Sequence, residues 1–232
     1  ELVNKITVDG REKKAYKLEI VKDEAVLIHL IFSKFLETSS LTKVETYLLQ
    51  NHIKTKNTKN FSRFTIRAIL SNPVYMIADK EAWDYYEEMG VEIYAEQSAF
   101  DGRHGIMAYN KTEQKPGKSN KVRDMKEWII AVGKHKGMIP GKEWVKVQRL
   151  LGQNNSKSYR KQKSNQALLS GLLFCGNCGS FMRPKQSQRV NANGEKVYSY
   201  LCETKEKSRM KNCAIKNPQG NELDKMICDE IK

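Results

Sequence analysis

Four cysteines in the last third of the chain follow a spacing that is typical of a metal-binding domain. Cys175 and Cys178 are separated by two residues, Cys178 and Cys202 by 23, and Cys202 and Cys213 by ten. Four thiolates in tetrahedral geometry are the ligands of zinc in a closed structural site. A domain of about 65 residues with few aliphatic side chains usually needs such a cross-link. We therefore expect residues 167–232 to form a zinc ribbon with structural Zn²⁺ bound by all four cysteines.

The sequence around these cysteines predicts turns and strands that bring the thiols together. Gly176 and Gly179 are expected to permit the tight turn that directs the first two sulfur atoms toward one centre. Apolar segments are expected to run as strands toward the site, one over 168–174 and one over 196–202. An Asn-Gly pair within 190–196 predicts a hairpin turn between strands.

Two other uses of a CxxC pair fit this sequence less well. A thioredoxin-like redox pair lies at the start of a helix in a βαβ unit, and no such pattern surrounds Cys175 and Cys178. A catalytic zinc ion keeps one coordination position open and usually has His or Glu ligands. The chain has four histidines, and none of them follows Cys175. Structural zinc is therefore the interpretation that we prefer.

The fifth cysteine, Cys228, lies outside this pattern. It falls in segment 221–232, whose apolar residues are spaced as on one face of a helix. We expect Cys228 to be a small buried apolar side chain rather than a metal ligand. Because the helical pattern continues to Lys232 and the chain starts at Glu1 without a methionine, we expect the sequence to be a fragment.

The charge of the chain indicates a nucleic-acid partner. Its 232 residues include 41 Lys and Arg against 27 Asp and Glu, which gives a formal net charge of +14. Such an excess is typical of nucleic-acid-binding proteins, although a basic protein kept soluble by its charge would show it too. The odd number of cysteines favours a reducing compartment, and no apolar run approaches the roughly 18 residues of a membrane span. We expect a cytoplasmic protein with no membrane partner.

Before the ribbon, residues 1–155 are expected to form a mixed domain in which helices precede a small sheet. Apolar residues at helical spacing predict a first helix capped by Asp23 and a second helix that starts near Ser40. A third helix is expected to begin after Ser62. It should stop before Pro73, because the residue that precedes a proline avoids helical geometry.

The remaining pattern of this domain predicts strands. Short strands are expected on either side of an exposed turn at 10–14, and further strands near 91–96, 104–113 and 127–139. A last helix is expected with Pro140 in its first turn. The predicted fold class is α+β: a mixed helical and small-sheet domain, then the zinc ribbon, then the start of a C-terminal helix.

The third predicted helix and the loop before it carry candidate DNA contacts. Arg63, Thr65 and Arg67 lie off the apolar stripe of the helix, and Lys56 and Lys59 lie in the loop. The N-terminal part of such a helix can reach base edges, while the loop binds phosphates. A small helical bundle with a solvated basic face is the alternative, and spacing alone does not separate the two.

Segment 156–166 is expected to be a basic linker between the two domains. A linker of this kind between DNA-binding modules often follows the minor groove, and a plain solvated tether is the alternative. Its candidate DNA contacts are Lys157, Tyr159, Arg160, Lys161 and Lys163.

The predicted hairpin of the ribbon carries a third set of candidates. Gln and Arg side chains are suited to base edges and Lys side chains to phosphates. We expect this arm to contact DNA through Arg183, Lys185, Gln186, Gln188 and Arg189.

Three segments together resemble a known family. These are FSRFTIRAILSNPVY at 61–75, LLSGLLFCGNCGSFM at 168–182 and YSYLC at 198–202. They resemble the C-terminal part of large serine recombinases of the phage integrase type, in which a recombinase domain precedes a zinc ribbon. The resemblance covers nearly the whole chain, and the ordered combination is more specific than the cysteine pair alone.

The resemblance implies sequence-specific binding of double-stranded DNA at half of a phage or bacterial attachment site. Both domains would enter the major groove, and the linkers would follow the minor groove. The catalytic serine domain of the family lies upstream, so no catalytic residue is expected in this chain. The intact enzyme would integrate and excise DNA through a phosphoserine intermediate, as a dimer or tetramer in a bacterial host cell. A coiled-coil arm would extend from the ribbon.

Two further function classes remain as alternatives to the recombinase reading. A zinc-ribbon module of a transcription or RNA-processing factor would lack the segment 61–75. A zinc hydrolase would need a motif such as HExxH, which this sequence does not contain.

Overall fold

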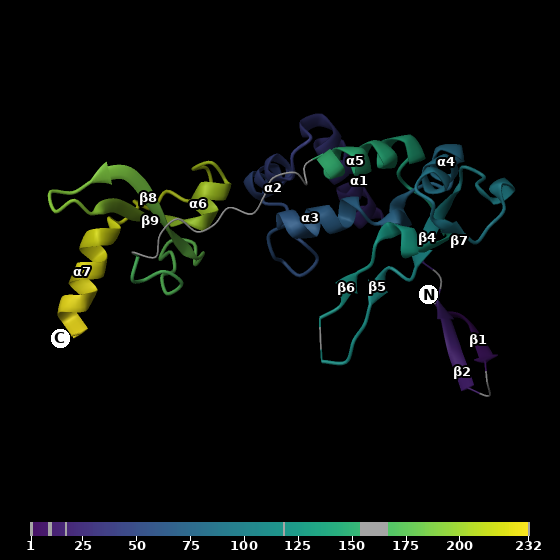
Figure 1. The fold of residues 1–232 in the computed structure, drawn as a ribbon, viewed down its shortest axis with the longest axis horizontal. Helices are drawn as coiled ribbons and strands as arrows, with labels where there is room; N and C mark the ends of the chain where they lie inside the picture. The colour runs from purple at the N-terminus through teal and green to yellow at the C-terminus, as the bar shows by residue number, and fades with distance from the viewer. Residues whose placement is uncertain (1, 9–10, 17, 118, 154–166, 232) are drawn as a thin grey trace. The chain divides into compact units, whose positions relative to one another are not determined.

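The computed structural model describes residues 2–8, 11–16, 18–117, 119–153 and 167–231 (Figure 1). It divides into two compact units. We call Glu1–Leu41 with Phe64–Ser156 unit 1, and Thr42–Arg63 with Lys157–Lys232 unit 2. The described chain is α+β, as the sequence predicts, with helices and small sheets in both units.

An antiparallel hairpin opens unit 1. Strands β1 (Leu2–Val8) and β2 (Arg11–Tyr16) pair in a register that sets Val8 opposite Arg11. Two N-terminal strands are therefore present as expected, but the turn expected at 10–14 is wrong for residues 11–14, which belong to β2.

Helix α1 (Lys22–Thr38) follows the hairpin and buries one apolar face. Its N-cap is Val21, so the expected capping role of Asp23 is wrong. Asp23 instead lies in the first turn of the helix, where its negative charge is favourable beside the exposed N–H groups. Phe32 and Phe35 are buried at the centre of the apolar face.

Three short helical elements come next along the chain. They are α2 (Leu41–Gln50), α3 (Arg63–Leu70) and the 3₁₀ turn η1 (Pro73–Tyr75). The first two helices start within one residue of the positions that the sequence predicts. Helix α3 ends before Pro73, and the Asn72 side chain accepts a hydrogen bond from the Val74 N–H at 3.4 Å.

The sheet of unit 1 has three strands in the order β3-β7-β4. Strand β7 (Ile129–Lys136) pairs in parallel with β3 (Glu92–Ile93) and antiparallel with β4 (His104–Tyr109). The strands are shorter than expected, because residues after Tyr109 leave this sheet. They form a separate hairpin of β5 (Thr112–Glu113) and β6 (Lys121–Val122).

Two helices complete the core of unit 1. Helix α4 (Lys80–Glu88) was not expected from the sequence, and α5 (Gly141–Gln153) follows Pro140 as predicted. Tyr85 and Trp144 meet edge to face between these helices, with ring centroids 5.7 Å apart. Such aromatic pairs add to the stability gained by burying the rings.

A two-stranded ribbon and two helices make up most of unit 2. Strand β8 (Met182–Val190) pairs antiparallel with β9 (Lys196–Cys202), so the predicted hairpin is confirmed. Helix α6 (Glu203–Lys207) follows β9 directly (Figure 1). Helix α7 (Gly220–Ile231) packs against β9. The strand expected over 168–174 is wrong, because this segment forms consecutive turns.

Helix α7 is attached to the ribbon by a buried hydrogen-bond cluster. The Asp224 carboxylate is 7% exposed and accepts bonds from the hydroxyls of Tyr198 and Tyr200 and from the Leu168 N–H. Burial and the bond to Asp224 together raise the pKa of Tyr200 to about 12, so its hydroxyl stays a donor. The Leu169 N–H donates in turn to the Tyr200 oxygen at 3.0 Å.

The outer face of α7 differs from the sequence prediction. Cys228 is exposed, so its expected burial is wrong. Leu223 and Ile227 pack against the ribbon core, whereas Met226 is 64% exposed. Helical spacing identified an apolar face, but only a part of that face is covered by the ribbon.

None of the described helices combines the length and the apolar character that a bilayer span requires.

Candidate zinc centre and nucleic-acid surface

The four predicted ligands converge on one point. The Sγ atoms of Cys175, Cys178, Cys202 and Cys213 all lie within 4.8 Å of one another. Two of the separations are 3.7 Å, between Cys175 and Cys213, and 3.5 Å, between Cys178 and Cys202. A tetrahedral zinc ion with Zn–S bonds of about 2.3 Å holds its sulfur atoms about 3.8 Å apart. The donor set and its spacing therefore fit Zn²⁺.

The first ligand pair is held by a tight turn. The Gly179 N–H donates to the Cys175 carbonyl, and the Cys175 N–H donates to the Ser180 carbonyl, both at 2.8 Å. Gly179 has φ +66°, in the region that favours glycine, so the sequence prediction is right for this residue. It is wrong for Gly176, which lies outside that region and where an added Cβ would meet nothing within 4 Å.

The second ligand pair encloses a helix, which explains its wide spacing. Cys202 ends β9 and is the N-cap of α6. The chain then returns through Arg209 and Met210, both with positive φ, to Cys213. The Asn177 side chain donates from the first turn to the Cys213 Sγ at 3.7 Å. The ten intervening residues thus build α6 and its return turn beside the metal site.

The thiols of the cluster have divergent proton affinities. Burial raises the pKa of Cys178, but hydrogen bonds from Ser180 and the neighbouring thiols outweigh it and lower this pKa to about 6. Burial raises the pKa of Cys202 to about 12. Four sulfur atoms at this distance cannot all ionise without a cation between them, because their charges repel. A divalent ion would allow all four to act as thiolates.

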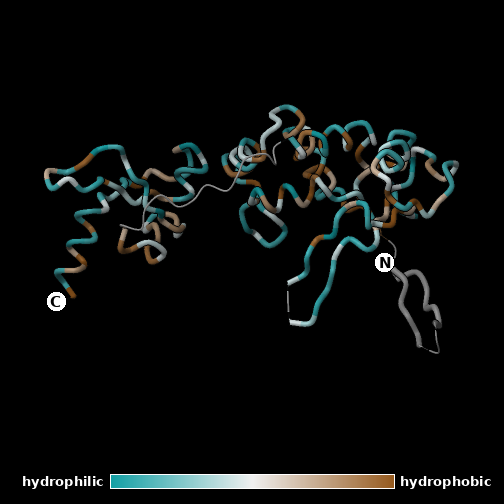
Figure 2. Tube along the Cα trace, viewed as in Figure 1, coloured by the Kyte–Doolittle hydropathy of each residue, from teal (hydrophilic) through white to brown (hydrophobic). Residues whose placement is uncertain are grey.

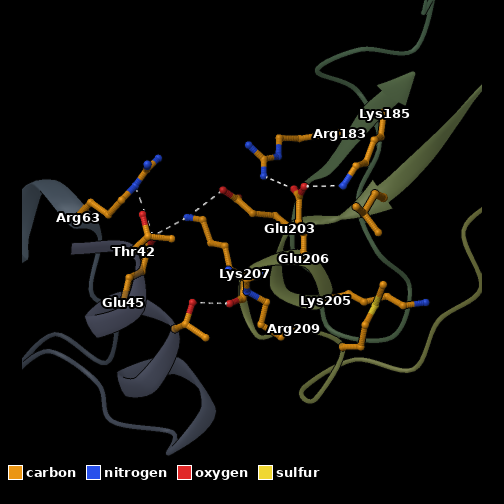
Figure 3. Close-up of a pocket in the computed structure, with 13 residues that line it drawn as sticks. Thr42, Glu45, Arg63, Arg183, Lys185, Glu203, Lys205, Glu206, Lys207 and Arg209 are labelled. Atoms are coloured by element: carbon orange, nitrogen blue, oxygen red, sulfur yellow. Dashed lines mark hydrogen bonds and ion pairs between the residues drawn. The ribbon is translucent and has the colours of Figure 1, made fainter. Parts of the chain in front are cut away.

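Unit 2 also contains a charged pocket (Figure 3). It has a volume of about 570 Å³ and brings together Arg63, Arg183 and Lys185, three of the predicted DNA contacts. Three carboxylates face these cations across the pocket. The charged residues of its lining are Arg63, Arg183, Lys185, Lys205, Lys207, Arg209, Glu45, Glu203 and Glu206.

Glu206 on α6 binds both basic residues of β8. Its Oε2 lies 2.5 Å from the Arg183 Nη2, and its Oε1 lies 3.1 Å from the Lys185 Nζ (Figure 3). Partial burial raises the pKa of Glu206, but the hydrogen bond from Lys185 and the charge of Arg183 outweigh it and lower the pKa. The sequence reasoning missed Glu206, and the only signal for it was an acidic residue four positions after Cys202.

Glu45 is a second carboxylate that the sequence reasoning missed. It is 5% exposed on α2 and lies 3.6 Å from the Arg63 Nε and 3.2 Å from the Lys207 Nζ. Lys207 also pairs with Glu203 at 3.0 Å, and its pKa is raised, since these two carboxylates outweigh its partial burial. A buried carboxylate needs such partners, because an unpaired charge is costly to remove from water.

The other predicted DNA contacts have varied surroundings. Lys56 and Lys59 lie exposed in the loop between α2 and α3, which is hydrophilic along most of its length (Figure 2). Thr65 and Arg67 are half-buried on α3. Gln186 is half-buried on β8, whereas its neighbours Gln188 and Arg189 are exposed. The linker candidates lie outside the described residues: Lys157, Tyr159, Arg160, Lys161 and Lys163.

An exposed aromatic residue on α3 also escaped the sequence reasoning. Phe64 follows Arg63 and is 82% exposed. Its position off the apolar stripe of the helix was the signal that could have identified it.

Comparison with known families agrees with this architecture. A family model described as "Recombinase" matches residues 22–154, more than half of the chain. The chain belongs to the Recombinase family. A second model, described as "Recombinase zinc beta ribbon domain", matches residues 168–232, so a recombinase domain is followed by a zinc ribbon. This order is the one that the large serine recombinase resemblance implies.

Individual relatives of this recombinase chain span more than the chain itself. A Bacillus subtilis (strain 168) protein described as "Putative DNA recombinase" is 28% identical over 225 residues. The match covers 94% of the chain but 40% of that protein, so the chain spans about two fifths of its length.

Two solved structures also align with the recombinase chain. One is titled "Crystal Structure of a LSR-DNA Complex", with 18% identity, a TM-score of 0.32, and coverage of 98% of this chain and 55% of that chain. The other is titled "Sequence Requirements of the Listeria innocua prophage attP site", with 17% identity, a TM-score of 0.30, and coverage of 97% and 74%.

Proposed function

We propose that this chain is the DNA-targeting region of a large serine recombinase. It binds double-stranded DNA at half-sites of phage and bacterial attachment sites, and so directs site-specific integration and excision. The observation that carries the proposal is the succession of a Recombinase match at 22–154 and a zinc-ribbon match at 168–232 in one chain. The net charge of +14 favours binding to a phosphate backbone.

The proposed binding surface has three parts. Helix α3 offers Arg67, the linker at 156–166 follows the minor groove, and β8 offers Arg183 and Lys185. The domain limits that go with it are 1–155 and 167–232. A lone zinc ribbon from a transcription or RNA-processing factor would have no counterpart of the Recombinase match.

Zinc has a structural role in this proposal. The four cysteines would bind Zn²⁺ as thiolates, and the ion would supply only a fixed geometry, because four protein ligands leave no open coordination position. The ion holds β9, α6 and the first turn to one point, since Cys202 ends β9 and starts α6. It thereby fixes the strand β8 that pairs with β9.

Strand exchange is assigned to another part of the parent protein. We propose that its serine nucleophile forms a phosphoserine intermediate and that this chain contributes affinity and sequence selection. Recombination joins two sites, so the parent protein acts as a dimer or tetramer, in the cytoplasm of the bacterial host.

DNA footprinting tests the proposal. The zinc-loaded chain is incubated with duplexes that carry candidate phage and host attachment sites, at two salt concentrations, beside a duplex of shuffled sequence. We expect protection of a defined half-site that survives at the higher salt, with weak and strongly salt-dependent binding to the shuffled duplex. Equal binding to all duplexes at both salt concentrations would overturn the assignment of attachment-site selection.

A further inference from the structure

Glu206 is positioned by the metal site and the ribbon together. It lies on α6, within the segment that runs from Cys202 to Cys213, so a candidate metal ligand stands at each end of that segment. Arg183 and Lys185 are two residues apart on β8 and so project from the same side of the strand. The Glu206 carboxylate therefore lies between these two cations and binds one with each oxygen atom (Figure 3).

The contact leaves part of the Arg183 side chain accessible to a ligand. Arg183 contacts Glu206 through its Nη2, and a guanidinium carries five N–H donors. The side chains of Arg183 and Lys185 remain 45% and 61% exposed. The pair is therefore held in place without being covered.

Fixing a long side chain before it binds a ligand reduces the conformational entropy that it loses on binding. A free Arg or Lys loses rotamer freedom when it binds a base, whereas one that is already fixed loses less. A base edge has one correct geometry, so this gain applies at a matched sequence. A phosphate in a non-specific complex accepts many geometries and gains little from a fixed donor. The negative charge of Glu206 also weakens purely electrostatic binding.

We propose that Glu206 is a positioning residue that sets DNA sequence discrimination by holding Arg183 and Lys185 in a fixed arrangement. This inference rests on the proposed function, since it concerns the same DNA surface. It assigns to Glu206 an effect on the ratio of specific to non-specific affinity rather than on affinity alone. The carboxylate itself does not need to touch the DNA.

Glu206→Gln tests this role, because glutamine keeps the size of the side chain and removes the charge. The specific probe is a duplex selected from a random library by the wild-type chain, and the non-specific probe is the unselected library. We expect the affinity ratio of the two probes to fall about three- to tenfold, from the ordering of two side chains. Glu222→Gln is the matched control: it removes an exposed carboxylate on α7 and should change the ratio less than about twofold.

The same substitution in a chain that lacks both cations shows whether Glu206 acts by positioning them or only by supporting the fold. In an Arg183→Ala/Lys185→Ala chain, Glu206→Gln should leave the ratio unchanged, because its targets are gone. An equal fall in that background, or an unchanged ratio in the single variant, would overturn the inference while wild-type DNA binding stands. Failure of the wild-type chain to select any duplex would overturn the proposed function, and this inference with it.

Discussion

The Tyr200 hydroxyl donates a hydrogen bond to the Asp224 carboxylate across 2.7 Å, and neither side chain is more than 7% exposed. The same carboxylate accepts from the Tyr198 hydroxyl and from the Leu168 N–H. It therefore joins α7 to β9 and to the first residues of the ribbon. A buried polar group is stabilising only while its partners are present, so this cluster is sensitive to the loss of its acceptor.

Asp224→Ala is expected to destabilise the ribbon. It leaves the buried hydroxyls of Tyr198 and Tyr200 without their acceptor, and each buried unsatisfied group costs about 1–3 kcal/mol, so a loss of about 2 kcal/mol or more is expected. Amide hydrogen exchange of β9 and α7 in the zinc-loaded chain measures it. Glu230→Ala, an exposed change in the same helix, should leave exchange unaltered. Unchanged exchange in Asp224→Ala would mean that apolar contacts alone hold α7.

Cys178→Ser should abolish stoichiometric zinc binding, whereas Cys228→Ser should retain it. The first change leaves three thiolates, and the second removes an exposed thiol outside the cluster. Metal analysis of the two purified variants and the wild-type chain gives the comparison. Since the metal supplies folding free energy, Cys178→Ser should also lose the native circular dichroism of the ribbon. A wild-type chain free of zinc would contradict the assignment of the metal.

The two glycines of the first turn should respond differently to alanine. Gly179→Ala forces a Cβ into the left-handed region at a cost of about 1–2 kcal/mol, which corresponds to a roughly tenfold loss of zinc affinity. Gly176→Ala meets open space at an ordinary φ and should keep the wild-type affinity. Competition for zinc against a chelator provides the measurement. Equal losses in both variants would show that the turn changes shape when zinc binds.

Arg183→Ala and Arg67→Ala are expected to weaken binding to the selected duplex. Each loss should be about 1–3 kcal/mol if the side chain binds a base through two hydrogen bonds, with relaxed selection at that base. A phosphate contact would instead lower the salt dependence and affect all sequences alike. Titrations at two salt concentrations separate these results, with Arg149→Ala on α5 as the control. Unchanged affinity at both salts would remove the residue from the binding surface.

The metal cluster could be predicted from the sequence because ligand spacing along a chain is a local property. The close pair Cys175 and Cys178, the hairpin turn and the position of Cys202 at a strand end all follow from short segments. The strand expected over 168–174 failed for the opposite reason. Apolar composition identified a buried segment, including Leu169, but it does not distinguish a strand from a series of turns with a buried side chain.

The partners of charged residues could not be predicted in this way. Glu206 meets Arg183 only because the β8–β9 register and the return of α6 bring residues 23 positions apart together. Asp224 likewise meets Tyr200 through packing of α7 on β9. Cys228 is exposed because the ribbon does not cover that part of α7. The spacing of apolar residues along the helix does not show how far this cover extends.

The register of the β8–β9 hairpin shifts between Gln186 and Val190. The inner part of the hairpin is tied to the candidate metal site through Cys202, while the outer part carries Gln188 and Arg189 on a locally irregular ladder. A shift of this kind bends the strand and increases its local right-handed twist. The bend thus aims the side chains of the tip in a direction that the anchored base does not share, so the two ends of one hairpin can meet a partner at different angles.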